Sequence, residues 1–476
     1  MNRLSNTTSD RKSFTLPPRQ IMLAGLLLLG LFAVAGAFTD TTLSGNDATR
    51  FAVVQAVGEQ HVFHIENTEF RTVDAVRRDG HVYSDKPLLL GWSLGMLHRA
   101  VRGVTGWSFP ENYSLLIWFY NVLTGFAVNA LLFCWLFNML RRIRMGTLTA
   151  KGLLAFAGIA GTWLLSYSVL LNNHTPAALA FAGVYIMLEK YRRIPSAALA
   201  CGIGAAAGLA AGLDIPLGLL CCGAAALAVR QMTPGKNMLY CAAGSATVLL
   251  LCGALNFAAY GTCVPLYLAG STGTFHPTLM LDPGYYAETL IGWRGFFLYQ
   301  PFLLLGLIPQ KKETVPDRWM YLFALAGIVF YCIGTNEFGG AAYGFRYLIP
   351  LIPVLYYRSC KWLLAVKWKK EIKAVCAAVL LLWGILSAVV GAYAPFCVAF
   401  EGYRSPAEHF TRTVRSSFGG NLLCASFEYA PDSVLTEKLI RYYGKATAHR
   451  FLYESYFNLK RPDLLRKTLE RAKEDL

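Results

Sequence analysis

Two pairs of oppositely charged residues stand close together in the first fifth of the sequence, Asp47 with Arg50 and Asp85 with Lys86. Such pairs suit group transfer, because a carboxylate can take the proton from an attacking hydroxyl while a cation holds an anionic leaving group. Structural explanations compete with this one. Asn46 or Asp47 can cap a helix that starts here, and Lys86 can extend its ammonium group to solvent beside an exposed acid. Taken alone, Asp47 therefore reads first as a helix cap, and a functional role stays open.

Further polar residues stand at the edges of apolar segments later in the chain. They are an amide, an imidazole, two acids and two arginines: Asn173, His174, Asp214, Arg294, Glu337 and Arg346. Each has an ordinary structural explanation when it is taken alone. Together with the two charged pairs, they predict a ring of polar groups at one face of a membrane.

The composition indicates which kind of molecule positions these residues. Of 476 residues, 55% are hydrophobic and only 15% are charged, yet the formal net charge is +16. A chain so rich in apolar and aromatic residues is not disordered. A soluble nucleic-acid-binding protein is disfavoured, because it would gather its basic residues on a hydrophilic domain. We therefore expect an all-α polytopic membrane protein, with membrane lipids and no nucleic acid among its partners.

Apolar segments that approach the length of a bilayer-spanning helix recur along the chain. We predict about eleven transmembrane helices, at 21–38, 113–140, 152–171, 175–189, 196–213, 214–229, 237–258, 296–309, 319–335, 345–358 and 374–394. With a cytoplasmic N-terminus, 22 of the 44 Lys and Arg residues fall in segments that face the cytoplasm. The positive-inside rule therefore places the N-terminus inside, and an odd number of spans places the C-terminus outside.

This topology divides the chain into a cytoplasmic tail (1–20), a transmembrane domain (21–394) and an extracytoplasmic C-terminal helical region (395–476). The first extracytoplasmic loop, 39–112, carries both charged pairs, and we expect interfacial helices in it. Residues 35–37 read Ala-Gly-Ala, which is typical of a signal-peptide cleavage site. An uncleaved anchor is favoured, because it holds the loop close to the membrane.

The C-terminal region has a helical pattern of its own. Apolar residues recur at helical spacing within 448–476, on both sides of a turn at Arg461 and Pro462. This predicts a helical hairpin, either an ordinary one or one of the tetratricopeptide type. One such unit cannot bury its own apolar face, so it should pack on the rest of the protein. A disulfide between Cys397 and Cys424 is compatible with an extracytoplasmic location.

The charged pairs stand in segments that resemble motifs of the GT-C glycosyltransferases. More narrowly, the chain is similar to the protein-mannosyltransferase and aminoarabinose-transferase branch, glycosyltransferase family 39. That branch has an Asp-Glu-x-x-Arg-like start of the first outer loop and a Glu-Lys-Pro-Pro-Leu-like motif later in it. The matching segments here are Asn46-Asp47-Ala48-Thr49-Arg50 and Asp85-Lys86-Pro87-Leu88. The resemblance covers about residues 20–360, and it departs from the pattern at Ala48 and Asp85.

The resemblance implies a multi-pass glycosyltransferase of the bacterial plasma membrane. Such an enzyme moves a hexosyl or pentosyl group from a polyprenyl-phosphate-linked donor to a protein, lipid or glycan acceptor on the extracytoplasmic face. One displacement at the anomeric carbon inverts its configuration. The sequence identifies neither the sugar nor the acceptor.

Roles for individual residues follow from the same resemblance. Asp47 would be the general base, and four cations would bind the donor phosphate: Lys86, Arg346, Arg50 and Arg294. Four further residues would orient substrates: Asp85, Asn173, His174 and Glu337. No cofactor is required. A divalent metal on His174 with Asp47 or Glu337 has little support, because the sequence shows no paired-ligand spacing.

Two other functions fit the same sequence. One is a transporter or flippase for an anionic or lipid-linked solute, and the other is a non-catalytic component of polysaccharide export or assembly. Transporters usually show internal repeats and polar groups near the membrane midplane. The sequence has no clear repeat and few charges within its predicted spans, so the enzyme is favoured.

Overall fold

The chain was analysed as a computed structural model that describes residues 17–36, 42–268, 281–292, 294–311, 313–335, 339–340, 342–396, 417–459 and 461–475. Glu337 and Cys397 lie outside these residues, so the expectations for them stay predictions.

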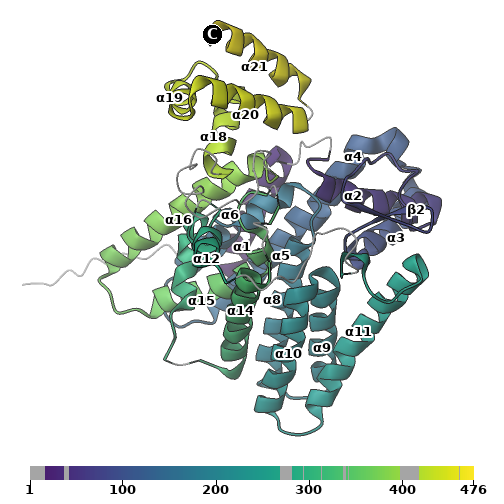
Figure 1. The fold of residues 1–476 in the computed structure, drawn as a ribbon. Coiled ribbons are helices and arrows are strands. Elements are labelled where there is room, and N and C mark those ends of the chain that lie inside the picture. Colours follow the sequence, from purple (N-terminus) through teal and green to yellow (C-terminus); the bar gives the residue numbers. More distant parts are fainter. Residues whose placement is uncertain are drawn as a thin grey trace, which may run out of the picture.

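Helices make up most of the described chain (Figure 1). The α-helices are α1 (Pro18–Gly36), α2 (Gly45–Gln55), α3 (Leu88–Thr105), α4 (Phe109–Asn121), α5 (Ala127–Arg141), α6 (Leu148–Ala160), α7 (Trp163–Ser166), α8 (His174–Tyr191), α9 (Ala197–Leu213), α10 (Ile215–Met232), α11 (Asn237–Tyr260), α12 (Pro283–Leu290), α13 (Phe296–Tyr299), α14 (Val315–Gly334), α15 (Ile352–Ala365), α16 (Lys370–Tyr393), α18 (Ser417–Tyr429), α19 (Val434–Tyr443), α20 (Lys445–Asn458) and α21 (Pro462–Asp475). The π-helical segments are η1 (Ala56–Gln60) and η2 (Val122–Phe126), and the 3₁₀ segments are η3 (Tyr167–Val169), η4 (Leu266–Leu268), η5 (Pro301–Leu307) and η6 (Arg346–Leu351).

Five described helical segments are long and apolar enough to cross a membrane, and a bent pair makes a sixth. They are Phe109–Arg141, α10, α11, α14, α16, and α6 with the segment 163–169, which bends by 47°. Elsewhere, prolines interrupt the predicted spans. Pro301 begins η5 and Pro350 lies inside η6, where a missing N–H disfavours a regular α-helix. The fold is that of an α-helical membrane protein, while the number of eleven spans stays a prediction.

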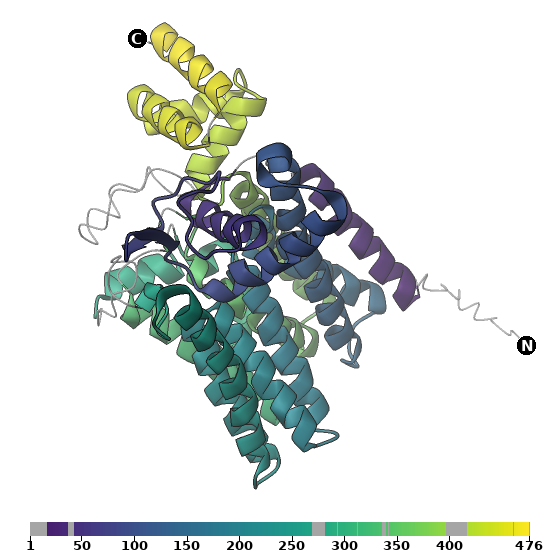
Figure 2. The same ribbon diagram turned by 90° about the vertical axis from the view of Figure 1, so that its right-hand side faces the viewer.

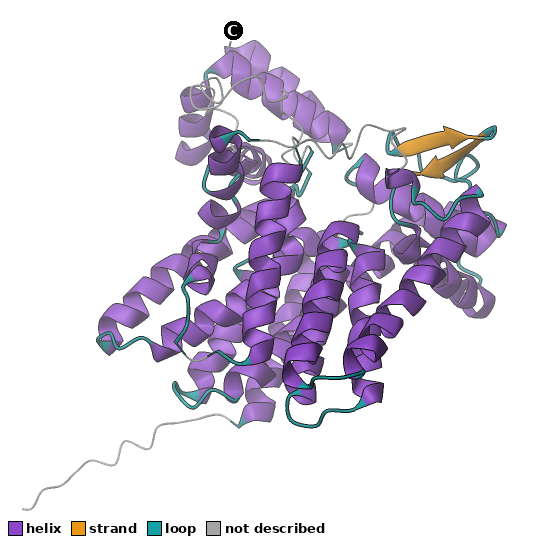
Figure 3. Cartoon of the chain, turned by 60° about the horizontal axis from the view of Figure 1, so that its bottom comes forward, coloured by secondary structure: helices purple, strands orange, loops and turns teal. Residues whose placement is uncertain are grey.

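A two-stranded hairpin departs from the all-α expectation. Strands β1 (Ala75–Arg78) and β2 (His81–Ser84) pair antiparallel, with Ala75 opposite Ser84. The turn is Asp79-Gly80, and both residues have positive φ, as two-residue hairpin turns require. Asp-Gly between residues such as Val76 and Val82 is a known hairpin signal, so the sequence contained the information. Figure 3 shows this hairpin in orange beside the helices of the first loop.

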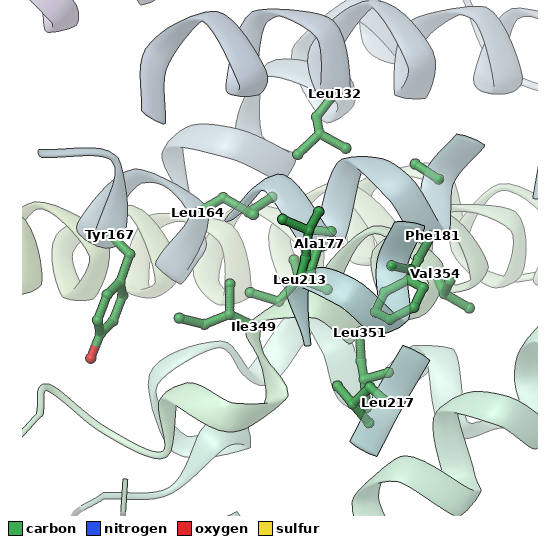
Figure 4. Close-up of a cluster of buried hydrophobic side chains, with 14 of the residues drawn as sticks. Leu132, Leu164, Tyr167, Ala177, Phe181, Leu213, Leu217, Ile349, Leu351 and Val354 are labelled. Carbon is green, nitrogen blue, oxygen red and sulfur yellow. The ribbon is translucent and has the colours of Figure 1, made fainter. Parts of the chain in front are cut away.

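The central core surrounds α8, which contacts α5, α9, α10, α14, α15 and η6. Figure 4 shows side chains that meet here, drawn from several of these helices. Leu132 of α5, Phe181 of α8, Leu217 of α10 and Val354 of α15 are all fully buried. On the outside, α11 and α16 carry exposed leucine, valine and phenylalanine side chains. A patch of this kind is unfavourable in water but suits the hydrocarbon of a bilayer.

Helices α9 and α11 approach each other through glycines. A Cβ atom on Gly204 would stand 1.8 Å from the carbonyl oxygen of Cys241, and one on Gly244 would stand 2.1 Å from that of Cys201. The Ser245 hydroxyl donates a hydrogen bond across this contact to the Gly204 carbonyl oxygen, at 2.9 Å. Small residues permit such close backbone contact between membrane helices.

The first loop and the C-terminal helices lie at the same end of the molecule, and the α10–α11 connection lies at the other (Figures 1 and 2). Helices α18 to α21 bury a small core of their own, which includes Phe427, Leu452 and Tyr456. The predicted C-terminal hairpin corresponds to α20 and α21. The unit also packs on the bundle, since the Asn421 amide donates to the carbonyl oxygens of Val390 and Ala394 at 3.1 and 2.9 Å.

Candidate functional site

A polar cavity of about 260 Å³ lies where α2, α8 and α10 begin. Its walls come from the start of α2, the residues flanking the hairpin, the starts of α8 and α10, α14, and the segment 340–347. The polar and aromatic residues that line it include Asn46, Arg50, Asp74, Lys86, Asn173, His174, Asp214, Tyr331, Arg346, Tyr347 and Phe396. Five of the predicted site residues thus meet around one cavity: Arg50, Lys86, Asn173, His174 and Arg346.

Asp47 has a different setting from the one expected for a general base. Ser44 is the N-cap of α2, and its hydroxyl accepts from the Asp47 N–H while the Asp47 carboxylate accepts from the N–H groups of Leu43 and Ser44 at 2.8 and 2.7 Å. The Ser44 hydroxyl also donates to this carboxylate, at 2.7 Å. The Asp47 side chain is buried and is not among the cavity-lining residues. Burial raises the pKa of Asp47, although these hydrogen bonds oppose the change. The structure thus gives Asp47 the capping role.

Arg50 projects from the first turns of α2 and connects it to the start of α8. Its guanidinium donates to the Asn46 carbonyl oxygen and to the Asn173 side-chain oxygen, each at 2.6 Å. The Asn173 amide in turn donates to the Leu213 carbonyl oxygen at 2.8 Å, at the end of α9. Burial, together with the positive charge of Arg346, lowers the pKa of Arg50 to about 10. Arg50 is still protonated at neutral pH, so it presents a desolvated cation to the cavity.

Lys86 lies between two carboxylates at the base of the hairpin. Its Nζ is 3.0 Å from Asp74, which precedes β1, and 2.8 Å from Asp85, which follows β2. Asp85 is buried, and burial raises its pKa despite the charge of Lys86. The hairpin therefore brings Asp74 and Lys86 together from positions twelve residues apart.

His174 is oriented by Asp214, which lies at the junction of α9 and α10. Its Nδ1 is 3.1 Å from Asp214, whose other oxygen accepts from the Tyr331 hydroxyl at 3.2 Å. In the tautomer that donates from Nδ1 to Asp214, the other ring nitrogen, Nε2, is the one able to accept a proton. This arrangement resembles the way in which an acid orients a histidine base.

Among the described residues, the Arg346 guanidinium has aromatic rather than charged neighbours. It lies over the rings of Phe396 and Tyr347, 4.9 and 5.7 Å from their centroids. Its Nε is buried and has no hydrogen-bond partner among the described residues. Aromatic faces stabilise a cation without occupying its N–H donors, so these donors stay available to an anion.

One other predicted residue, Arg294, lies outside the cavity. Arg294 is buried, accepts a backbone hydrogen bond from Phe345 at 3.0 Å, and does not line the cavity. Glu337 lies outside the described residues. Asp74 was missed, because nothing in its sequence context marks it. Asp214 was noticed as a polar residue at a helix end, but its pairing with His174, 40 positions away, has no local sequence signal.

An apolar pocket of about 180 Å³ adjoins the polar cavity and shares Pro87 and Ile215 with it. Its other walls are mainly leucine side chains from α3, α10 and α11, together with residues of the segment 263–268: Leu88, Leu89, Leu219, Leu249, Cys263, Pro265 and Leu268. A charged cavity and an apolar pocket thus lie side by side.

This fold is similar to that of ArnT from Cupriavidus metallidurans. The structure of ArnT bound to undecaprenyl phosphate matches with a TM-score of 0.50 and 14% identity, over 95% of this chain and 78% of that chain. The apo structure of ArnT gives a TM-score of 0.49 and 14% identity, over 94% and 78%. No protein-family model matches the sequence, nor does the sequence of any curated protein. The match to the lipid-bound structure confirms that the chain has a fold like that of ArnT.

Proposed function

We propose that this chain is a membrane glycosyltransferase that moves a sugar from a polyprenyl-phosphate-linked donor to an acceptor on the extracytoplasmic face. The observation that carries the proposal is the cavity itself. Three arginine and lysine side chains, Arg50, Lys86 and Arg346, line it, against the carboxylates of Asp74 and Asp214. ArnT, whose fold the chain shares, has been solved with undecaprenyl phosphate bound.

The donor phosphate would bind chiefly to Arg346. Lys86 forms ion pairs with two carboxylates, and Arg50 donates hydrogen bonds to Asn46 and Asn173. Part of the donor capacity of these two cations is therefore already used. Within the part of the chain that the structure describes, Arg346 has aromatic neighbours and an Nε without a hydrogen-bond partner. Charge that develops on the leaving phosphate oxygen is stabilised most by donors that are in place before the reaction.

The polyprenyl chain would enter the adjoining apolar pocket, where Leu88 and Leu219 contribute to the wall. Pro87 and Ile215 border both spaces, so a lipid phosphate could place its headgroup in one and its first isoprene units in the other.

The acceptor hydroxyl must lose a proton as it attacks the anomeric carbon. We propose that His174, oriented by Asp214, takes this proton, because His174 lines the cavity. In this proposal Asp47 supports the site by fixing the start of α2, which carries Arg50. The general-base role of Asp47 stays a prediction from the family resemblance. Attack opposite the departing phosphate would invert the anomeric configuration.

The donor assignment can be tested by binding of undecaprenyl phosphate to the purified full-length chain. We expect Arg346→Ala and Lys86→Ala to weaken binding at least tenfold, with the larger effect at Arg346. Arg450→Ala is a matched control, because Arg450 is an exposed arginine of α20, remote from the cavity. Unchanged affinity in both cavity variants would show that the phosphate assignment is wrong.

Transfer itself can be tested by mass spectrometry of surface glycans and glycolipids from a deletion strain. A modification that disappears on deletion and returns with the wild-type chain, but not with Arg346→Ala, identifies the acceptor. Accumulation of an unmodified lipid-linked sugar on the cytoplasmic side would instead indicate a flippase.

A further inference from the structure

Three side chains that the proposed reaction does not use converge on the outer side of the hairpin. His81 Nδ1 is 2.6 Å from the Glu66 carboxylate, and His64 Nδ1 is 3.1 Å from the same oxygen. The two imidazole rings stack, with centroids 4.4 Å apart and planes at 20°. Each of the three residues offers one ligand atom, and these atoms all lie within 4.8 Å of one another. His64 and Glu66 form a His-x-Glu pair that the sequence interpretation overlooked.

We propose that His64, Glu66 and His81 bind one divalent transition-metal ion, with Zn²⁺ as the best fit. Two imidazole nitrogens and a carboxylate oxygen form a donor set that zinc commonly takes, with water at the fourth position. His81 Nδ1 and the Glu66 carboxylate are hydrogen-bonded at 2.6 Å, while His64 Nδ1 lies 3.1 Å from the same oxygen. A metal with bonds of about 2.0–2.1 Å to nitrogen would take the place of the proton between His81 and Glu66, and the three side chains would shift to surround it.

The burial and accessibility of the three side chains suit a metal. His64 Nδ1 is buried and has no hydrogen-bond partner among the described residues, although it points to Glu66. The side chains of Glu66 and His81 are 28% and 48% exposed, which leaves an entry path.

The ion would join two stretches of the first loop that are fifteen residues apart. Backbone contacts already begin this connection, since the Ile65 N–H donates to the Val82 carbonyl oxygen at 2.7 Å. The Val82 N–H donates to Glu66 at 3.1 Å. Strand β2 leads directly to Lys86, so the metal would stabilise the hairpin whose base lines the cavity. The proposed role of the ion is to stabilise the hairpin, and it is independent of whether the cavity transfers a sugar.

The test is metal content of the purified full-length chain, prepared without a polyhistidine tag. The protein is stripped with chelator, equilibrated with Zn²⁺ alone, dialysed and analysed by mass spectrometry of the metal. We expect about one Zn²⁺ per chain for wild type. His81→Gln and Glu66→Gln should each lower the affinity for Zn²⁺ at least tenfold, and Zn²⁺ should raise Tm only in proteins that bind it.

His61→Asn is the matched control. His61 is an exposed histidine of the same loop outside the cluster, and its positive φ of 62° is a conformation that asparagine tolerates. This variant should bind Zn²⁺ as wild type does. The proposal is overturned if wild type retains no more Zn²⁺ than His81→Gln. It is also overturned if His174→Gln, rather than His81→Gln, removes the ion.

Discussion

At the residue scale, the two buried aspartates Asp47 and Asp214 have different surroundings. The Asp47 carboxylate accepts hydrogen bonds from its near neighbours Leu43 and Ser44. The Asp214 carboxylate accepts one from the Tyr331 hydroxyl and faces His174. A carboxylate that is held by three donors stabilises a local backbone conformation. A carboxylate that holds an imidazole sets which of its nitrogens carries the proton. Both residues were visible as acids in the sequence, but only the tertiary structure shows that their surroundings differ.

A comparison of Asp47→Asn with His174→Gln tests this difference. An asparagine at position 47 replaces one acceptor oxygen by an NH₂ group that cannot accept from Leu43 or Ser44, so the cap is weakened. We expect a loss of about 1–2 kcal/mol in the free energy of unfolding and a modest loss of turnover. His174→Gln should lower turnover by about 100-fold or more, as expected when a general base is removed.

The measurements are thermal unfolding of the detergent-solubilised variants and release of polyprenyl phosphate by folded protein. The opposite pattern would show that the family-based role of Asp47 is the right one. That pattern is an Asp47→Asn protein with unchanged unfolding and turnover at least 100-fold lower.

At the scale of elements, the sequence predicts the helices well, because the length of each apolar segment can be read directly along the chain. Every predicted span coincides with helical structure in the described residues, although Pro301 and Pro350 lie in segments that became 3₁₀. The hairpin was missed because β1 contains two arginines and so lacks the apolar alternation of a half-buried strand. The packing of α9 on α11 could not be predicted from the sequence either. Gly204 and Gly244 are seen to permit a close backbone contact only when both helices are placed.

The α9–α11 contact gives a prediction at this scale. Gly204→Ala places a methyl group against the Cys241 carbonyl oxygen, so the two helices must move apart and lose contacts along their length. We expect a destabilisation of about 1–3 kcal/mol. Gly223→Ala in α10 is the control, because nothing lies within 4 Å of its added Cβ, and alanine favours a helix by about 1 kcal/mol over glycine.

Thermal unfolding of both variants in the same detergent checks this prediction. Equal melting temperatures for Gly204→Ala and wild type would mean that α9 and α11 are not in direct contact in the membrane.

At the scale of the whole molecule, the two ends differ in what they carry. The cavity, the hairpin and the C-terminal helices share one end, while the α10–α11 connection, with Arg230 and Lys236 beside it, lies at the other (Figure 1). The charge distribution predicts that the second end is cytoplasmic. The sequence thus anticipated that the polar residues gather on one face, and five of the nine predicted site residues line the cavity there.

Reporter fusions test this orientation. Alkaline phosphatase joined after residue 476 should be active and green fluorescent protein at the same position dark, because the C-terminal helices are expected outside. Fusions after residue 234, in the α10–α11 connection, should give the reverse. Matching signals at the two positions would place both ends on one side and refute the predicted topology.

The hydrogen bonds from Asn421 to Val390 and Ala394 have a consequence for biosynthesis. The last carbonyl groups of a helix have no partner within it. At the end of α16, two of them accept hydrogen bonds from the Asn421 side chain, 27 residues beyond Ala394. A ribosome must therefore synthesise α18 before α16 can reach its final hydrogen bonding. A nascent chain that stops before Asn421 exposes these carbonyls at the mouth of the bundle. The final predicted span therefore completes its hydrogen bonds only after the C-terminal unit has been made. A truncated product would present quality-control proteases with a helix end whose carbonyl groups lack these partners.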